Sequence, residues 1–436
     1  MTDARVRLWG RTVGAVSWDA HRGLGVFQYA PKFIGSPVEP SPIVMPKAHA
    51  SYDFPANRAR GSEDDTYHGL PGLLSDSIPD KFGNALIDRW LASQGRAAGS
   101  MNPVERLCYV GKRGMGALEY EPAVREGLGR TTDVEVSVLV ELANEIVNAR
   151  SGLDGKLDGN TSGLEQILSV GTSAGGARAK AVLAWNPKTG AFKSGQLSAP
   201  PGYEHWLLKF DGVSDSGDRE ISDPRGYGRI EYAYYLMASS CGIDMMPSRL
   251  HEEGGRAHFM TRRFDRVGDS RIHMQSLCAL CHYDFNQVRA YSYEQAIQAC
   301  RSLELGTQAI EQQVRRAFFN VLARNQDDHT KNIAFMMDKA GRWRLSPAFD
   351  VAYAFNPEKF WTREHQMSLN EKTDHFEKDD LMAFAKFAGL KKSRALKVLE
   401  SVSIAVAGWA GFAREAEVPA KRAAQISGAH RSGLFV

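Results

Sequence analysis

The sequence predicts an α+β fold with a β-rich N-terminal part and a mostly helical C-terminal part. Apolar residues alternate from Val6 to Ala15 and again from Val26 to Tyr29, which predicts a small antiparallel sheet at the start of the chain. Beyond about Ser270 the apolar residues repeat mostly at helical spacing. A chain of 436 residues is long enough for about two or three such domains with cores of ordinary density.

The composition is that of an ordinary globular protein. With 54 Lys and Arg against 51 Asp and Glu, the net charge of +3 is too balanced for a dedicated nucleic-acid coat. The 43% hydrophobic and 24% charged residues exclude a disordered or fibrous chain. Because the N-terminus lacks the apolar core of a signal peptide and no stretch is long enough to span a bilayer, we expect a cytoplasmic protein without membrane contact. Five scattered cysteines indicate reduced thiols: Cys108, Cys241, Cys278, Cys281 and Cys300.

Three helices are predicted before the middle of the chain, over residues 81–91, 103–110 and 131–150. The third begins with a capping box formed by Thr132 and Glu135. The Gly, Asp, Asn and Ser residues of 151–163 then predict a loop.

The pattern next changes to a Gly-rich turn followed by strands. The turn covers 171–177, and strands are expected at 181–185, 205–210 and 257–264. Between the last two strands lie a loop over 211–229 and a helix from Ile230 to Cys241. A long helix over 310–322 leads into an Asp-rich loop, the apolar strand 333–337 and a turn at 338–341.

Two acids and an amide surround this last hairpin. Asp327 and Asn332 are five residues apart, the separation between the catalytic Asp and the metal-binding Asn in kinase catalytic loops. Asp350, one hairpin later, takes the place of a second metal ligand. This set suits ATP chemistry, because Mg²⁺ prefers hard oxygen ligands while a separate carboxylate positions the attacking hydroxyl.

A strand lysine completes the set. Lys209 has apolar neighbours, where a charge is costly without an anionic partner, and Glu231 on the next helix is placed to orient it. Each feature alone is weak: Lys209 alone is typical of a strand lysine that points outward, and the turn over 171–180 contains neither standard glycine phosphate motif. The order of glycine turn, lysine, glutamate and Asp-x-x-x-x-Asn together favours phosphoryl transfer.

Several motifs along nearly the whole chain resemble the HipA family of bacterial serine/threonine protein kinases, the toxins of HipA–HipB toxin–antitoxin pairs. They are Tyr29-Ala-Pro, Leu74-Ser-Asp-Ser-Ile-Pro-Asp80, Ser173-Ala-Gly-Gly-Ala-Arg-Ala-Lys180, Arg263-Phe-Asp-Arg266, Asp327-Asp-His-Thr-Lys-Asn332 and Pro347-Ala-Phe-Asp350. The resemblance implies a two-lobe protein-kinase-like fold, similar to phosphoinositide kinases, with an extra N-terminal β-rich subdomain. It divides the chain into that subdomain (1–125), a kinase N-lobe (126–265) and a helical C-lobe (266–436).

The resemblance also implies roles for individual residues. Asp327 would be the catalytic aspartate, Asn332 and Asp350 the Mg²⁺ ligands, and Lys209 the phosphate-binding lysine oriented by Glu231. ATP contacts would come from Gly175, Gly176, Ala177, Arg178, Ala179 and Lys180 at the phosphates, from the adenine-side connector Arg262, Arg263 and Phe264, and from His329 and Phe349. Ser173 would be the autophosphorylated serine, whose phosphate would repel those of ATP and switch the enzyme off.

Two departures from the family pattern concern nucleotide binding. Arg262 stands where relatives often have an acidic residue, and Arg178 and Lys180 make the phosphate loop more basic than in some relatives. Neither removes a metal ligand or the base. His329 is interpreted as a brace of the catalytic loop, because Asp327 already fills the base role.

The family further implies growth arrest by phosphorylation of a translation-related protein, with an aminoacyl-tRNA synthetase as one candidate, and neutralisation by a HipB-like antitoxin that would mediate any DNA contact. Two alternatives stay open: a silent kinase-fold protein that docks a DNA-binding partner, and a small-molecule or lipid phosphotransferase. For Cys278-Ala-Leu-Cys281-His282 the absence of a second ligand pair disfavours a zinc site. The basic cluster from Lys391 to Lys397 is interpreted mainly as a solvated helix face.

Overall fold

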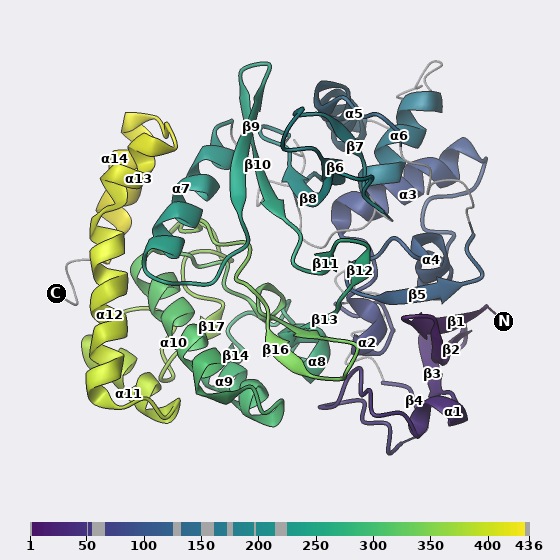
Figure 1. Cartoon of the computed structure of the whole chain (residues 1–436), viewed down its shortest axis with the longest axis horizontal. Helices are drawn as coiled ribbons and strands as arrows, with labels where there is room; N and C mark the ends of the chain where they lie inside the picture. The colour runs from purple at the N-terminus through teal and green to yellow at the C-terminus, as the bar shows by residue number, and fades with distance from the viewer. Residues whose placement is uncertain are drawn as a thin grey trace. The chain divides into compact units, whose positions relative to one another are not determined.

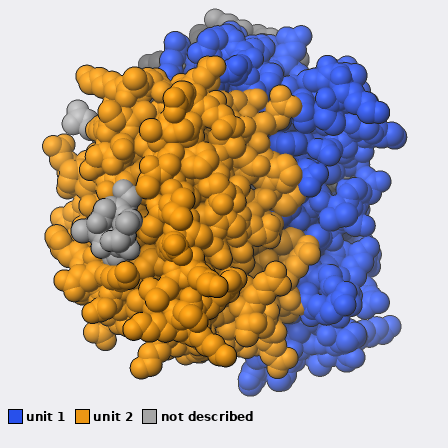
Figure 2. All heavy atoms as spheres, turned by 60° about the vertical axis from the view of Figure 1, so that its left-hand side comes forward, with its two compact units in different colours: residues 1–225, 251–275, 337–342 blue, residues 226–250, 276–336, 343–436 orange. Residues whose placement is uncertain are grey.

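The computed structural model describes residues 2–49, 51–54, 66–124, 132–149, 161–171, 178–195, 198–213 and 225–431. The chain forms two compact units, coloured separately in Figure 2. Unit 1 comprises residues 1–225, 251–275 and 337–342, and unit 2 comprises residues 226–250, 276–336 and 343–436. The predicted division into residues 1–125, 126–265 and 266–436 is a division by expected role, which these two units do not test. It stays a prediction.

The first sheet of unit 1 confirms the predicted N-terminal antiparallel strands. Its order is β4-β3-β2-β1-β5. Trp9 and Gly10 connect β1 and β2, and both have positive φ angles (49° and 78°), as a tight hairpin with the twist of its strands requires. The strands are β1 (Asp3–Leu8), β2 (Arg11–Asp19), β3 (Leu24–Tyr29), β4 (Ser51–Tyr52) and β5 (Leu118–Glu121).

Two of the three helices predicted for this part of the chain, 81–91 and 103–110, are confirmed in unit 1 as α3 and α4. Asn102 and Glu105 form a capping box at the start of α4, and Asp80 caps α3 by accepting a hydrogen bond from the backbone N–H of Gly83. The helices are α1 (Pro31–Ile34), α2 (Gly72–Ser75), α3 (Lys81–Ser93), α4 (Pro103–Val110), α5 (Val136–Ala149) and α6 (Thr161–Gly171).

The third predicted helix starts later than expected, and its capping box is wrong. The backbone N–H of Thr132 donates to Ser194 Oγ (3.1 Å), and that of Val134 donates to the Phe192 carbonyl (3.1 Å). Residues 132–134 therefore lie along a sheet edge, and α5 begins only at Val136. Tertiary pairing overrides the local capping signal here.

Helix α6 also corrects the loop predicted over 151–163, because it begins at Thr161. Its apolar residues Ile167, Leu168 and Val170 are buried in one core cluster with Phe82 and Leu86 of α3. Burial of these side chains stabilises a helix whose Gly and Ser residues indicated a loop. Residues 151–160 of that predicted loop lie outside the described part of the chain.

A second sheet runs in the order β7-β6-β8-β10-β9, and residues of β6, β7, β8 and β10 lie in the same core cluster as α3, α5 and α6. Lys180 of β6 and Lys209 of β8 are register partners, and Phe259 of β10 pairs with Lys209 on the other side. The strands are β6 (Lys180–Trp185), β7 (Phe192–Ser194), β8 (Glu204–Lys209) and β10 (Arg256–Arg262), with the short strands β11 (Arg266–Val267), β12 (Ser270–Arg271) and β13 (His273–Ser276) following. Strand β9 (Ser248–Glu253), which precedes β10, was not predicted.

Unit 2 is mostly helical, as the sequence predicts, and is built around α10 (Gly306–Leu322). Helix α10 contacts α9 and α12, while α7 contacts α12 and α13 (Figure 1). The further helices are α7 (Tyr227–Ser240), α8 (Leu277–Cys281), α9 (Tyr293–Ser302), α11 (Lys378–Phe387), α12 (Lys392–Ala407), α13 (Trp409–Glu415) and α14 (Ala420–Ala429). The short strands are β14 (Tyr291–Ser292), β15 (Ala334–Met337), β16 (Trp343–Leu345) and β17 (Met367–Ser368).

All five cysteines are free and buried, and Cys278 and Cys281 lie in α8. Across the described residues no single helix is long and apolar enough to cross a membrane; one bent pair, α12 with α13, meets the criteria of length and composition only.

Candidate active site

The Asp-rich loop that follows α10 is held in a fixed shape by its own polar groups. The Asn332 side-chain amide donates to the Asp327 carbonyl (2.8 Å), and the Asn332 backbone N–H donates to the His329 carbonyl (2.9 Å). Residues Thr330–Asn332 form a single 3₁₀ turn. The loop thereby brings the two ends of the Asp-x-x-x-x-Asn motif together.

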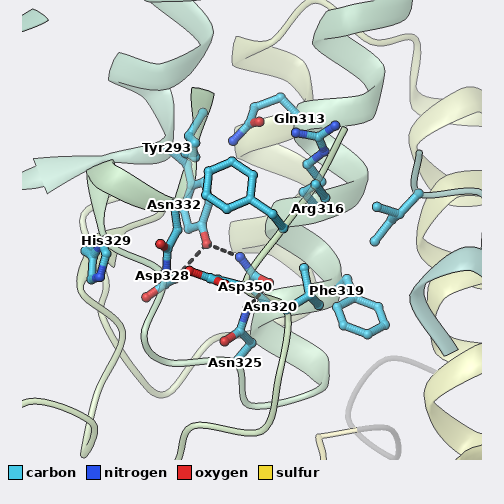
Figure 3. A pocket seen from close by; sticks show the side chains of 15 residues that line it. Tyr293, Gln313, Arg316, Phe319, Asn320, Asn325, Asp328, His329, Asn332 and Asp350 are labelled. Atoms are coloured by element: carbon cyan, nitrogen blue, oxygen red, sulfur yellow. Dashed lines mark hydrogen bonds between the residues drawn. The ribbon is translucent and has the colours of Figure 1, made fainter. Parts of the chain in front are cut away.

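The amide of Asn332 is oriented by this hydrogen bond. Because its NH₂ group donates to Asp327, its oxygen is directed away from that bond and can serve as a metal ligand. Asn332 and Asp350 line the same pocket in unit 2, as Figure 3 shows. The sequence-predicted pair of Mg²⁺ ligands therefore faces one space.

The backbone of Asp350 adopts a left-handed conformation, with φ at 53°. For a non-glycine residue this conformation costs about 1–2 kcal/mol, although Asp and Asn tolerate it better than most. Such strain is kept where the surrounding fold fixes it, and it often occurs at functional sites.

Asp328, next to the predicted catalytic residue, is directed inward rather than outward. Its carboxylate accepts hydrogen bonds from the Tyr293 hydroxyl (2.6 Å) and from the backbone N–H of Gln366 (2.7 Å). The Tyr293 hydroxyl in turn accepts from the Asn320 amide (2.8 Å; Figure 3). Burial raises the pKa of Asp328, but its interaction with His365 and these hydrogen bonds outweigh burial, and the net pKa is lowered.

His365 connects Asp328 to the C-terminal segment. Its Nδ1 lies 2.7 Å from Asp328 Oδ2, and its Nε2 lies 3.2 Å from Nη1 of Arg431. The imidazole ring therefore lies between the Asp328 carboxylate and the Arg431 guanidinium. Arg431 also forms an ion pair with Asp374 and donates to the Val321 carbonyl (3.0 Å).

His329 lies beside Asp327 and packs against aromatic rings. Its Nε2 is 3.7 Å from Asp327 Oδ1, and its ring contacts Phe285 and Trp361 with centroid distances of 5.1 and 6.1 Å. These contacts agree with a bracing role.

Behind Asp350 the pocket is closed by α10. Arg316 donates to the Ser346 carbonyl (2.6 Å), just before the Pro347–Asp350 segment, and burial lowers its pKa to about 10. Gln313 and Phe319 line the same space.

Unit 1 carries the lysines of the predicted phosphate site. Lys209 is buried in β8 with Nζ 5.8 Å from the centre of the Phe259 ring. Lys180, its register partner, forms an ion pair with Asp80 (3.2 Å) in which both side chains are at least 96% buried. The predicted loop residue Ala179 accepts the Phe210 backbone N–H (3.0 Å), so its carbonyl belongs to the sheet, and Arg178 directly precedes it.

The predicted adenine-side connector joins β10 to a buried ion cluster. Arg262 is partly exposed and lies 3.6 Å from Glu204. Arg263 makes two hydrogen bonds to the Asp265 carboxylate (2.9 and 2.7 Å), and its backbone N–H donates to the His205 carbonyl (2.9 Å). Phe264, which is half-buried, follows directly.

The remaining predicted ATP-site residues fall into three groups. Ser173, Gly175, Gly176 and Ala177 lie outside the described residues. Glu231 is buried in α7 of unit 2, whereas Lys209 belongs to unit 1, so their pairing stays a prediction. Phe349 lines the same pocket as Asp350.

The structure adds residues that the sequence reading missed: Asp80, Asp328, Trp361, His365 and Arg431. The Asp327-Asp328 pair offered a signal, since two successive acids in a loop seldom face the same way. Nothing in the local sequence marks Trp361, whose Nε1 donates to Asp327 Oδ1 (2.6 Å).

Two family models match the chain. The HipA N-terminal domain matches residues 4–121, and the HipA-like C-terminal domain matches residues 172–409. The second match alone covers more than half of the chain. The chain therefore belongs to the HipA family, and the α+β fold class predicted from the sequence is confirmed.

Comparison with solved structures agrees at the level of the fold. A chain in the complex of the Shewanella oneidensis MR-1 toxin–antitoxin system HipA, HipB and its operator DNA has a TM-score of 0.65 at 15% identity, covering 99% of this chain and 96% of that one. The Helicobacter pylori proinflammatory kinase CtkA gives a TM-score of 0.33 at 12% identity over 51% of this chain and 92% of that one, which is too low to define a shared fold. No curated protein sequence matches significantly.

Proposed function

We propose that this protein is an ATP- and Mg²⁺-dependent serine/threonine protein kinase of the HipA type. The observation that carries the proposal is the arrangement of the loop after α10. Asn332 is hydrogen-bonded to Asp327 and lines one pocket with Asp350, which combines a base and two hard oxygen ligands in a single rigid loop and hairpin.

The proposed reaction uses Asp327 as the group that accepts the substrate proton. The serine or threonine hydroxyl donates a hydrogen bond to the Asp327 carboxylate, its oxygen forms the new bond to the γ-phosphorus, and the bond to the β-phosphate bridging oxygen breaks to release ADP. The hydroxyl proton ends on Asp327 and passes to solvent. Asp327 is 44% exposed, so a protein substrate and solvent both have access to it.

The donor set of Asn332 and Asp350 fits Mg²⁺, which keeps few protein ligands and takes the rest from phosphates and water. Within the described residues no cluster of three or more His, Cys, Asp or Glu side chains forms a closed metal cage, so the nucleotide would complete the coordination. Bound Mg²⁺ would supply charge neutralisation of the β- and γ-phosphates.

For unit 1 we propose that Lys209 binds phosphate oxygens and that residues 175–180 wrap the nucleotide phosphates. Lys180, paired with Asp80, would anchor the end of that segment in the sheet rather than bind phosphate through its ammonium group. Autophosphorylation of Ser173 would place a dianion beside the ATP phosphates and switch the enzyme off.

Family membership supports a HipB-like antitoxin as partner, because a protein of this fold occurs with HipB and operator DNA in the Shewanella oneidensis complex. DNA contact would then be made through the antitoxin. A translation-related protein, for example an aminoacyl-tRNA synthetase, is the proposed substrate class.

Nucleotide binding and phosphotransfer test this function together. Titration calorimetry with ATP should show binding that strengthens with Mg²⁺ in the wild type and loses this Mg²⁺ dependence in Asp350→Asn. Transfer of γ-phosphate to protein should stop in Asp327→Asn and continue in the matched control Asp379→Asn, an exposed acid in the first turn of α11. A wild-type protein that neither binds ATP nor transfers phosphate would contradict the proposal and favour a silent docking protein.

A further inference from the structure

The two oxygens of the Asp327 carboxylate differ in their surroundings. Oδ1 accepts the Trp361 indole N–H at 2.6 Å and lies 3.7 Å from His329 Nε2. Among the residues that the structure describes, no group donates to Oδ2. One oxygen is thus fixed by the protein, while the other is open to an incoming hydroxyl.

Trp361 is itself held on both sides of its backbone. The Arg289 guanidinium donates to the Phe360 carbonyl (2.9 Å), and the Gln366 side chain donates to the Trp361 carbonyl. The indole ring packs edge-on against Phe285 at a centroid distance of 6.4 Å. A side chain that is anchored in this way can hold the Asp327 carboxylate in one orientation and is not expected to move out of the site.

The segment that contains Trp361 is hydrogen-bonded to two successive residues of the catalytic loop, Asp327 and Asp328. The Trp361 indole N–H donates to Asp327, and the backbone N–H of Gln366 donates to Asp328 Oδ1 (2.7 Å). Asp327 and the segment 361–366 therefore form one connected unit, in which the position of the indole follows that of the loop.

The chemistry of the donor matters as well. A neutral indole N–H fixes the rotation of the carboxylate without cancelling its negative charge, whereas a lysine or arginine in that place would form an ion pair and weaken the base. We propose that Trp361 is a positioning residue that orients Asp327 so that Oδ2 accepts the hydroxyl of the protein substrate. This inference rests on the proposed kinase function.

The test compares wild type, Trp361→Phe and the control Trp343→Phe, a tryptophan of β16. In phosphotransfer at saturating ATP, we expect Trp361→Phe to lower kcat about tenfold, the loss that corresponds to one hydrogen bond to a charged group. The KM for ATP and the thermal unfolding temperature should stay close to wild type, and Trp343→Phe should match wild type throughout.

An unchanged or raised kcat in Trp361→Phe would overturn the inference, since a raised rate would mean that the indole blocks the site. Parallel losses of ATP affinity and thermal stability would also overturn it, because they mark a structural role. Inactive wild-type protein would instead reject the kinase function itself.

A second readout is independent of activity. In protein labelled with ¹⁵N-tryptophan, the indole resonance that disappears in Trp361→Phe should shift in Asp327→Asn, because its acceptor loses charge. An indole resonance that is insensitive to Asp327→Asn would contradict the hydrogen bond on which the inference depends.

Discussion

His365 Nδ1 lies 2.7 Å from Asp328 Oδ2, and both side chains are almost completely buried. This contact ties the catalytic loop to the segment after Asp350, and Arg431 extends it to the end of α14. The two neighbouring aspartates therefore differ in their surroundings: Asp328 is buried in the support of the loop, whereas Asp327, the proposed base, is 44% exposed.

We expect Asp328→Asn to destabilise the protein by about 3 kcal/mol, because it leaves His365 and Tyr293 without their charged acceptor in a buried site. Urea unfolding measures this loss. Asp327→Asn, which changes a 44% exposed side chain, should cost less than about 1 kcal/mol. Equal effects of the two substitutions would contradict the division of tasks.

Stability should fall in mild acid because of His273. This side chain is buried, its Nε2 faces the Pro40 carbonyl at 2.8 Å, and burial lowers its pKa from 6.5 to about 4. Between these pH values the unfolded chain binds a proton that the folded protein excludes, so the free energy of unfolding decreases by about 1.4 kcal/mol per pH unit as pH falls.

His273→Gln keeps a donor for Pro40 and removes the titration. Measured by denaturant unfolding from pH 7 to pH 4, the variant should show a shallower loss of stability than wild type. Parallel curves for the two proteins would refute the assignment to His273. The loss of stability would then come from other histidines whose pKa is lowered to about 4, namely the buried His205 and His258 and the half-buried His282 and His430.

Because the backbone of Asp350 is left-handed, substitutions at this position can distinguish its effect on stability from its proposed role as a Mg²⁺ ligand. Asp350→Ala should lose Mg²⁺-dependent activity and about 1 kcal/mol of stability, because a Cβ without a polar group is strained at this φ. Asp350→Gly should lose the same activity while unfolding at or above the wild-type temperature. If Asp350→Gly is less stable than Asp350→Ala, strain at this position is not the cause.

The ion pair between Asp80 and Lys180 connects α3 to β6 within unit 1. Removing one partner leaves the other charge buried, so Lys180→Met should cost about 3–5 kcal/mol. The double variant Asp80→Asn with Lys180→Met should recover part of this loss, since the Asn side chain can still cap α3 and no buried charge remains. Additive losses in thermal or urea unfolding would show that the two side chains do not interact.

Local signals in the sequence sufficed where neighbouring residues decide the structure. The predicted helix over 103–110 is present as α4, where Asn102 and Glu105 form a capping box within one turn, and the Asp-rich loop brings Asp327 to Asn332 within six residues. The same logic failed at Thr132, because a strand distant in sequence captured its backbone.

The residues that hold the site in place could not be predicted from neighbouring residues in the sequence, because they are distant from it along the chain. His365 is 37 residues from Asp328, and Arg431 is a further 66 residues from His365. Periodicity and spacing report only near neighbours, so contacts such as that of Trp361 with Asp327 appear only once the chain is folded.

The most direct test of the kinase function is intact-mass analysis and phosphosite mapping of the purified protein before and after incubation with ATP and Mg²⁺, beside Asp327→Asn. We expect phosphate on Ser173 in the wild type and none in the variant. No phosphate in either protein, together with no measurable ATP binding, would contradict the central claim.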